Sequence, residues 1–154
     1  MERRDYILLE IEKIGQLLTA IKQKLFGGKE NLAITIEKQT EETKDILLTE
    51  LNFDMDKFLA LDRDESEQYL SEFKGFDIEN TEQLADIVSQ TGFAGKSKKH
   101  LEKALQLYEL CRLNSKTYSW DRERKITEIK NANHIRQNLS THLEMQRMSR
   151  LTLS

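Results

Sequence analysis

The segment Gly92-Phe93-Ala94-Gly95-Lys96-Ser97 comes closest in this chain to a nucleotide-binding motif. A phosphate-binding loop needs four residues between its glycines, so that backbone N–H groups surround a phosphate, and it follows a strand. Here only Phe93 and Ala94 intervene, and residues 84–90 have a helical pattern. We therefore expect a helix that stops at Gly92 and a second helix capped by Ser97. Weak anion binding at that helix start stays open, assisted by the neighbouring lysines Lys96, Lys98 and Lys99.

A second pattern resembles the first half of a calcium-binding loop. Asp62, Asp64 and Ser66 have the alternate spacing of its first oxygen ligands. Glu67 then stands where the turn requires glycine, and Phe73 stands where a bidentate glutamate would complete the coordination. We expect these residues to cap a helix and to lie at the surface.

Histidine and cysteine give no further site. His100, His134 and His142 lack metal-ligand spacing relative to one another or to Cys111. Cys111 lies on an apolar helix face, which predicts a small buried thiol rather than a nucleophile. The sequence supplies no catalytic, cofactor-binding or metal-binding residue and no cofactor. An enzyme is left open without positive support.

Aromatic and basic residues near the last helix form the strongest candidate contact site. The residues are Tyr118, Trp120, Arg122, Arg124 and Lys125. Trp, Tyr and Arg dominate interface energetics, which favours a protein partner. An alternative for Trp120 is packing over the end of its own helix. Cations beside aromatics also suit nucleic acid, but interleaved acids are typical of a solvated helix face, so nucleic acid is the second hypothesis.

Charge divides along the chain although the formal net charge is only −3. Acidic residues greatly outnumber basic ones from Glu41 to Asp86, and basic residues exceed acidic ones after Gly95. Part of the acidity is explained by helix N-termini, which favour Asp and Glu. The two regions can attract each other within one chain or between two copies, so the pattern indicates assembly, including a homodimer.

Composition predicts an all-α protein. The chain of 154 residues has no proline and is rich in helix-forming residues. One cysteine excludes an internal disulfide, which favours a reducing cytoplasm. The first apolar stretch is interrupted by Asp5, Glu10 and Glu12, so we expect neither a signal peptide nor a membrane-spanning helix.

The elements follow from apolar spacing and capping residues. Ile7 to Leu25 forms one helical stripe, which predicts a first helix capped by Asp5 and ended at Gly27-Gly28. Asn31 is expected to cap a helix through Leu51. Asp54 is predicted to cap a helix over residues 55–61, and Asp64 is predicted to cap a helix that Gly75 closes. Asn80, with Gln83 three residues later, has the capping-box pattern before the apolar residues that begin at Leu84. Ser97 is predicted to cap a strongly apolar helix, and Ser119 is predicted to cap the last helix.

The segments Leu101–Leu113 and Ser119–Ile129 resemble a tetratricopeptide-type helical hairpin, which implies a peptide-binding surface. No second copy follows at a fixed period, so we expect no repeat array. The chain also resembles a family of small, uncharacterised bacterial helical proteins. That resemblance is carried by Asp5-Tyr6-Ile7-Leu8, Leu25-Phe26-Gly27 and Tyr118-Ser119-Trp120-Asp121-Arg122. It implies an all-helical fold and a bacterial source, without a known activity.

The sequence thus predicts a single-domain helical bundle of five to seven helices over residues 1–131. Residues 132–154 are expected to be a helical or partly disordered extension. The predicted function is a non-catalytic protein-interaction module in the bacterial cytoplasm, acting on a protein partner or a second copy. Nucleic-acid binding is the alternative, an enzyme the second alternative, and no membrane association is expected.

Overall fold

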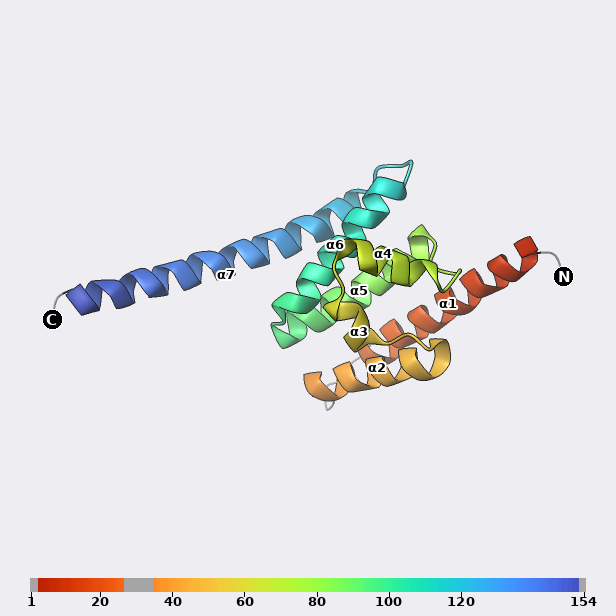
Figure 1. Cartoon of the computed structure of the whole chain (residues 1–154), viewed down its shortest axis with the longest axis horizontal. Coiled ribbons are helices and arrows are strands. Elements are labelled where there is room, and N and C mark those ends of the chain that lie inside the picture. Colours follow the sequence, from red (N-terminus) through yellow and green to blue (C-terminus); the bar gives the residue numbers. More distant parts are fainter. Residues whose placement is uncertain (1–2, 27–34, 153–154) are drawn as a thin grey trace. The chain divides into compact units, whose positions relative to one another are not determined.

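The computed structural model describes residues 3–26 and 35–152, with side chains over 4–26, 35–133 and 145–147. The described residues are all-α, as the sequence predicts (Figure 1). The helices are α1 (Arg3–Phe26), α2 (Ile36–Leu51), α3 (Met55–Ala60), α4 (Arg63–Ser71), α5 (Ile78–Gly95), α6 (Lys98–Asn114) and α7 (Trp120–Thr152).

The chain divides into two compact units, Met1–Tyr118 and Ser119–Ser154. The first unit contains α1 to α6, and the second consists of α7. The tetratricopeptide-like pairing of α6 with the last helix, and the domain limits 1–131 and 132–154, stay predictions.

The apolar stripe of α1 enters the core of the first unit. Ile14, Leu18, Ile21 and Leu25 are buried, whereas Leu8 near the start of the helix is exposed. Each fully buried side chain of this kind contributes about 1.5–3 kcal/mol. The predicted cap at Asp5 is wrong, because Asp5 already lies in the first turn of a helix that includes Arg3. Its carboxylate still favours that helix end through the helix dipole. Gly27 and Gly28 lie outside the described residues.

Thr35 caps α2 with an extended backbone, and its hydroxyl accepts the Lys38 N–H. The predicted cap, Asn31, lies outside the described residues. Asn52 ends the helix in the left-handed region, with its N–H bonded to Leu47 and Leu48 carbonyls. Thr43 is buried in the polar middle of α2, where its hydroxyl donates to the Gln39 carbonyl.

Asp54 caps α3 as predicted, since its side chain accepts the Lys57 N–H. The predicted cap of α4 is wrong: Asp62, not Asp64, is the N-cap, and it forms a reciprocal capping box with Glu65. Helix α4 ends at Ser71. The left-handed residue of the following turn is Lys74 (φ 56°) and not Gly75.

Asp77, rather than Asn80, caps α5, because Asp77 accepts the Asn80 backbone N–H. The Asn80 amide instead is buried and donates to the carbonyls of Ile11 and Gly75, both at 2.8 Å. It therefore joins α1 to the turn that follows α4. The predicted stop at Gly92 is also wrong, since the helix continues to Gly95.

Lys96 (φ 52°) adopts the left-handed conformation after α5. Ser97 caps α6 as predicted, because its hydroxyl accepts the His100 N–H. Ser119 likewise precedes α7 and accepts the Arg122 N–H, as predicted.

The core of the first unit is organised around α5, which packs against α1, α2 and α6. Its buried apolar residues are Leu84, Ala85, Ile87 and Val88. Beside them, α3, α4 and the adjoining turns contribute an aromatic cluster with ring centroids 5.1 to 6.0 Å apart, consisting of Phe53, Phe58, Tyr69, Phe73 and Phe76. This packing holds α3, α4 and the adjoining turns against one another.

Candidate functional site

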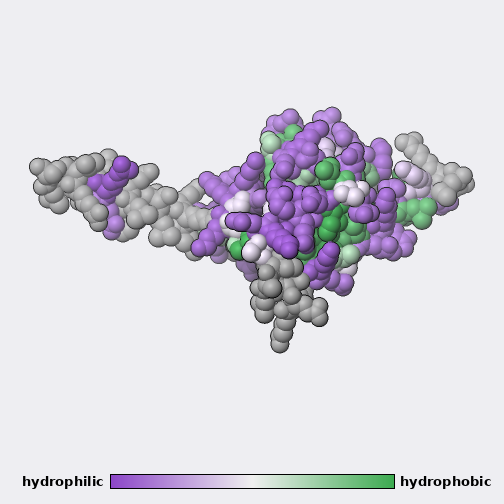
Figure 2. All heavy atoms as spheres, turned by 90° about the horizontal axis from the view of Figure 1, so that it is seen from below, coloured by the Kyte–Doolittle hydropathy of each residue, from purple (hydrophilic) through white to green (hydrophobic). Residues whose placement is uncertain are grey.

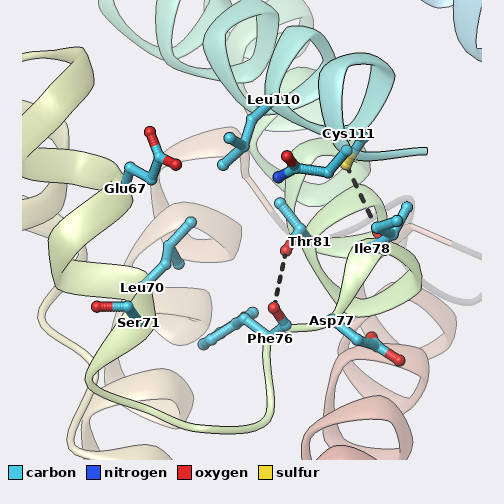
Figure 3. A pocket seen from close by; sticks show the side chains of 10 residues that line it. Glu67, Leu70, Ser71, Phe76, Asp77, Ile78, Thr81, Leu110 and Cys111 are labelled. Carbon is cyan, nitrogen blue, oxygen red and sulfur yellow. Dashed lines mark hydrogen bonds between the residues drawn. The ribbon is translucent and has the colours of Figure 1, made fainter. Parts of the chain in front are cut away.

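A cavity of about 250 Å³ opens beside α4, the start of α5 and the end of α6 (Figure 3). Leu70 and Phe76 lie on one side, and Ile78 and Leu110 lie on the other. Glu67 lines the cavity across from Leu110. The remaining lining residues are Ser71, Asp77, Thr81, Cys111 and Asn114.

A smaller hollow of about 40 Å³ continues the cavity and shares Glu67, Leu70 and Leu110 with it. Together the two hollows form a groove, which we call the α4–α6 groove. The smaller hollow adds the residues Arg63, Ser66, Gln106, Leu107 and Leu113. Leu113 lies at the end of α6 and is 77% exposed. An open groove floored by leucines can hold apolar side chains of another protein.

Most hydrogen-bond donors in the groove are already used within the chain. The Ser71 hydroxyl donates to the Gln68 carbonyl, and the Thr81 hydroxyl donates to the Phe76 carbonyl. The Cys111 thiol donates to the Ile78 carbonyl at 3.5 Å. Arg63 is paired with Glu109 at 2.6 Å. The side-chain amides of Gln106 and Asn114 keep N–H donors, and Arg63 is the one cation among the lining residues of the two hollows.

Some acceptors in the groove are not used, among them those of Gln106 and Glu67. Gln106 Oε1 is buried and has no hydrogen-bond partner among the described residues. The exposed Glu67 carboxylate forms no hydrogen bond or ion pair with any residue that the structure describes. A buried acceptor without a partner costs about 1–3 kcal/mol, so a donor from a ligand would be favourable there.

The thiol that lines the groove is engaged within the fold. Cys111 is buried, as the sequence predicts, and its thiol faces a backbone carbonyl rather than a base. No histidine lines the groove. Over the part of the chain that the structure describes, no group of three or more His, Cys, Asp or Glu could hold a metal ion. The groove is suited to binding by shape, apolar contact and charge.

No family model, no curated protein and no solved structure matches the chain. Functional inference therefore comes from the geometry alone. Along the described helices, no stretch is both long and apolar enough to cross a membrane.

The two aromatic residues of the sequence-predicted contact site are exposed. Tyr118, the last residue of the first unit, is 66% exposed, and Trp120, the first residue of α7, is 80% exposed. Most of the Trp120 indole thus faces solvent, as an interface residue does before its partner binds. Figure 2 shows other hydrophobic residues breaking the hydrophilic surface on the face that it displays.

The three cations of that site are in different environments. Arg122 is only 6% exposed and offers little surface to a partner. Arg124 bonds to Asp121 and Glu128, both at 2.7 Å, and Lys125 pairs with Asp121 at 3.0 Å. Arg124, and then Lys125, hold the pKa of the Asp121 carboxyl below its usual value. Arg124 and Lys125 thus already have carboxylate partners.

The nucleotide-like and calcium-like patterns are used as caps. Residues 92–95 end α5, and Ser97 begins α6, so no strand precedes the Gly-Lys-Ser segment. In the calcium-like pattern Asp62 caps α4, but the expected surface position of Ser66 is wrong, because Ser66 is buried and accepts from Lys103. His100 lies beside Ser97, with 2.7 Å between Nδ1 and the hydroxyl oxygen. Burial, followed by the charges of Lys44 and Lys99, lowers the His100 pKa. The side chains of His134 and His142 lie outside the described residues.

Sequence reasoning missed two buried polar groups. The Lys103 ammonium is buried, donates to the Leu61 carbonyl and Ser66 hydroxyl, and lies over the Phe58 ring. Burial lowers its pKa, and the Asp62 and Glu65 carboxylates oppose that shift. The sequence carried a signal for the burial of Lys103. Lys103 lies four residues before Leu107, and that spacing places both side chains on one face of the helix.

The second missed group is a network that joins three helices. Asp86 of α5 accepts from the Tyr108 hydroxyl of α6 and pairs with Lys22 of α1 at 3.0 Å. It adjoins no part of the α4–α6 groove. Its bonds hold α1 and α6 against α5, which is a structural role.

Proposed function

We propose that this chain is a non-catalytic protein-interaction module that binds an apolar segment of a partner in the α4–α6 groove. The observation that carries the proposal is the row of leucines along an open groove. Leu70 and Leu110 lie in the cavity wall, and Leu113 is exposed at its end. Exposed apolar surface in a concave site favours association, because contact removes it from water.

Facing residues of α4 and α6 support a helical partner segment. On α4 the groove residues recur as Arg63, Ser66, Glu67 and Leu70, and on α6 as Gln106, Leu107, Leu110 and Leu113. This spacing follows one side of each helix for about 12 Å. A bound helix of about two turns would match that length, as in other helix-in-groove complexes.

The exposed Tyr118 and Trp120 are proposed as additional contacts, each on its own unit. Tyr118 follows Leu113 closely in the sequence, so a partner that covers Leu113 would also be near Tyr118. The cytoplasmic setting is proposed because the single buried cysteine suits a reducing compartment. The bacterial source and the tetratricopeptide-like pairing rest on the sequence resemblances alone.

Replacing Leu113 by Gln tests the proposal, because this change removes an exposed apolar contact without altering charge or the core. The matched control is Leu48→Gln, since Leu48 is a 50% exposed leucine on α2, outside the groove. Affinity capture from the native host, read by mass spectrometry, should yield a partner with the wild type and Leu48→Gln that Leu113→Gln loses. Equal capture by both variants would exclude the groove as the binding site.

A further inference from the structure

The unused polar groups of the α4–α6 groove point to the chemistry of its ligand. Glu67 and Gln106 Oε1 are acceptors without partners among the described residues, whereas the Ser71 and Thr81 hydroxyls and the Cys111 thiol already donate to backbone carbonyls. Asp77 adds a second carboxylate, which caps α5 and keeps further lone pairs. A ligand that brings N–H donors would satisfy these acceptors.

Charge around the groove selects the same kind of ligand. Glu67 and Asp77 are the charged residues of the larger cavity, and Arg63, the cation of the smaller hollow, is held by Glu109. Further exposed acids extend the negative field, namely Asp64 and Glu65 of α4 and Glu72, which directly follows it. Such a field attracts cations and repels phosphate, so electrostatic complementarity favours a basic ligand over an acidic one.

We infer that the α4–α6 groove binds a cationic amphipathic helix of a partner protein. This inference rests on the proposed function and adds the partner's chemistry. Apolar side chains one turn apart would enter beside Leu70, Leu110 and Leu113. Lys or Arg on the flanks would pair with Glu67 and Asp77, and an N–H donor would reach Gln106 Oε1.

The probe is a fluorescent synthetic peptide of leucine and lysine, about 14 residues long so that it can be helical. A twin peptide carries glutamate in place of lysine. Fluorescence anisotropy with the full chain should show binding of the lysine peptide, weakened by added salt, and none of the glutamate peptide.

Glu67→Lys should weaken binding of the lysine peptide about tenfold or more, because an attraction becomes a repulsion. Glu50→Lys is the matched control: it makes the same charge change at an exposed position on α2, away from the groove, and should leave affinity unchanged. Circular dichroism of both variants checks that the fold is kept.

The remaining outcomes separate the two proposals. If Leu113→Gln weakens peptide binding but Glu67→Lys does not, the groove binds apolar segments regardless of charge, and the cationic inference is overturned while the proposed function stands. If neither change alters binding, both proposals fail. If light scattering finds a dimer that Glu67→Lys dissociates, the occupant is a second copy, which overturns a foreign partner.

Discussion

The buried turn between α4 and α5 places Gly75 against the backbone of α1. A Cβ atom at Gly75 would lie 2.6 Å from Ile14 Cδ1 and 2.7 Å from the Glu10 carbonyl oxygen. The residue is needed for this close approach and not for a left-handed backbone, because the positive φ of this turn belongs to Lys74. The backbone carbonyl cannot rotate away as a flexible side chain would.

We predict that Gly75→Ala destabilises the first unit by about 1–3 kcal/mol or more, the usual cost of overpacking. Gly95→Ala is the control, since a Cβ atom there would lie 3.6 Å from Ile36 Cγ2, an ordinary contact, and Gly95 lies in the last turn of α5. That change should be neutral or stabilise by up to about 1 kcal/mol, because alanine is the better helix former. Urea unfolding measures both, and an unchanged midpoint for Gly75→Ala would contradict the steric account.

Individual residues were predictable where one helix decides their environment. The burial of Cys111 followed from the apolar face of its own helix, and the structure confirms it. Lys103 shares that face, but its partners are the Leu61 carbonyl and Ser66 on another segment. Arg122 is buried although its immediate neighbours are charged. Pairings across distant parts of the chain are not encoded in local spacing.

Among the elements, caps were predicted correctly where only one suitable residue precedes the apolar pattern. Asp54 and Ser97 are such cases. Before α4, both Asp62 and Asp64 were candidates, and the choice of Asp64 was wrong. The signal that could have decided it was Glu65, three residues after Asp62, which completes the reciprocal pair of hydrogen bonds.

The capping box gives a prediction for α4. Asp62→Ala should cost about 0.5–2 kcal/mol, because it leaves the Glu65 N–H without its acceptor. Asp64→Ala should cost only a few tenths of a kcal/mol, through the weaker interaction of a first-turn carboxylate with the helix dipole. Thermal unfolding of the two variants compares them directly. A larger loss for Asp64→Ala would mean that the helix begins at the later residue.

The α4–α6 groove was beyond sequence reasoning for a geometric reason. The wide apolar surface of α6 was visible in Leu107, Leu110 and Leu113. Which of these leucines would be covered depends on how α4 lies against α6, and the contacts that join the two helices, Arg63 with Glu109 and Ser66 with Lys103, connect residues far apart in the sequence. The sequence therefore predicted the candidate contact residues at 118–125 and missed the groove.

At the scale of the whole molecule, some of the unevenly distributed charges are paired with opposite charges within the first unit. Arg63 of the acidic region pairs with Glu109 of the basic region, and Lys103 lies near the Asp62 and Glu65 carboxylates. Lys44 pairs with Asp56 at 3.0 Å. The partly exposed pairs Arg63–Glu109 and Lys44–Asp56 contribute about 0–1 kcal/mol each, so they direct contacts more than they stabilise the fold. The acidic side chains around the groove that take no part in these pairs are the charges that a partner can contact.

The same reasoning applied to α7 gives a prediction about nucleic acid. Binding to phosphates requires cations that can exchange their counterions for the ligand. Arg124 is bonded to two carboxylates and Lys125 to one, so the wild-type chain should produce no electrophoretic shift of single-stranded RNA or DNA at low salt. Asp121→Asn with Glu128→Gln removes these carboxylates and should introduce a weak, salt-sensitive shift.

A wild-type shift abolished by Arg124→Glu with Lys125→Glu would instead establish nucleic-acid binding. Arg122 is left out of this test because a carboxylate at its buried position would disturb the fold itself.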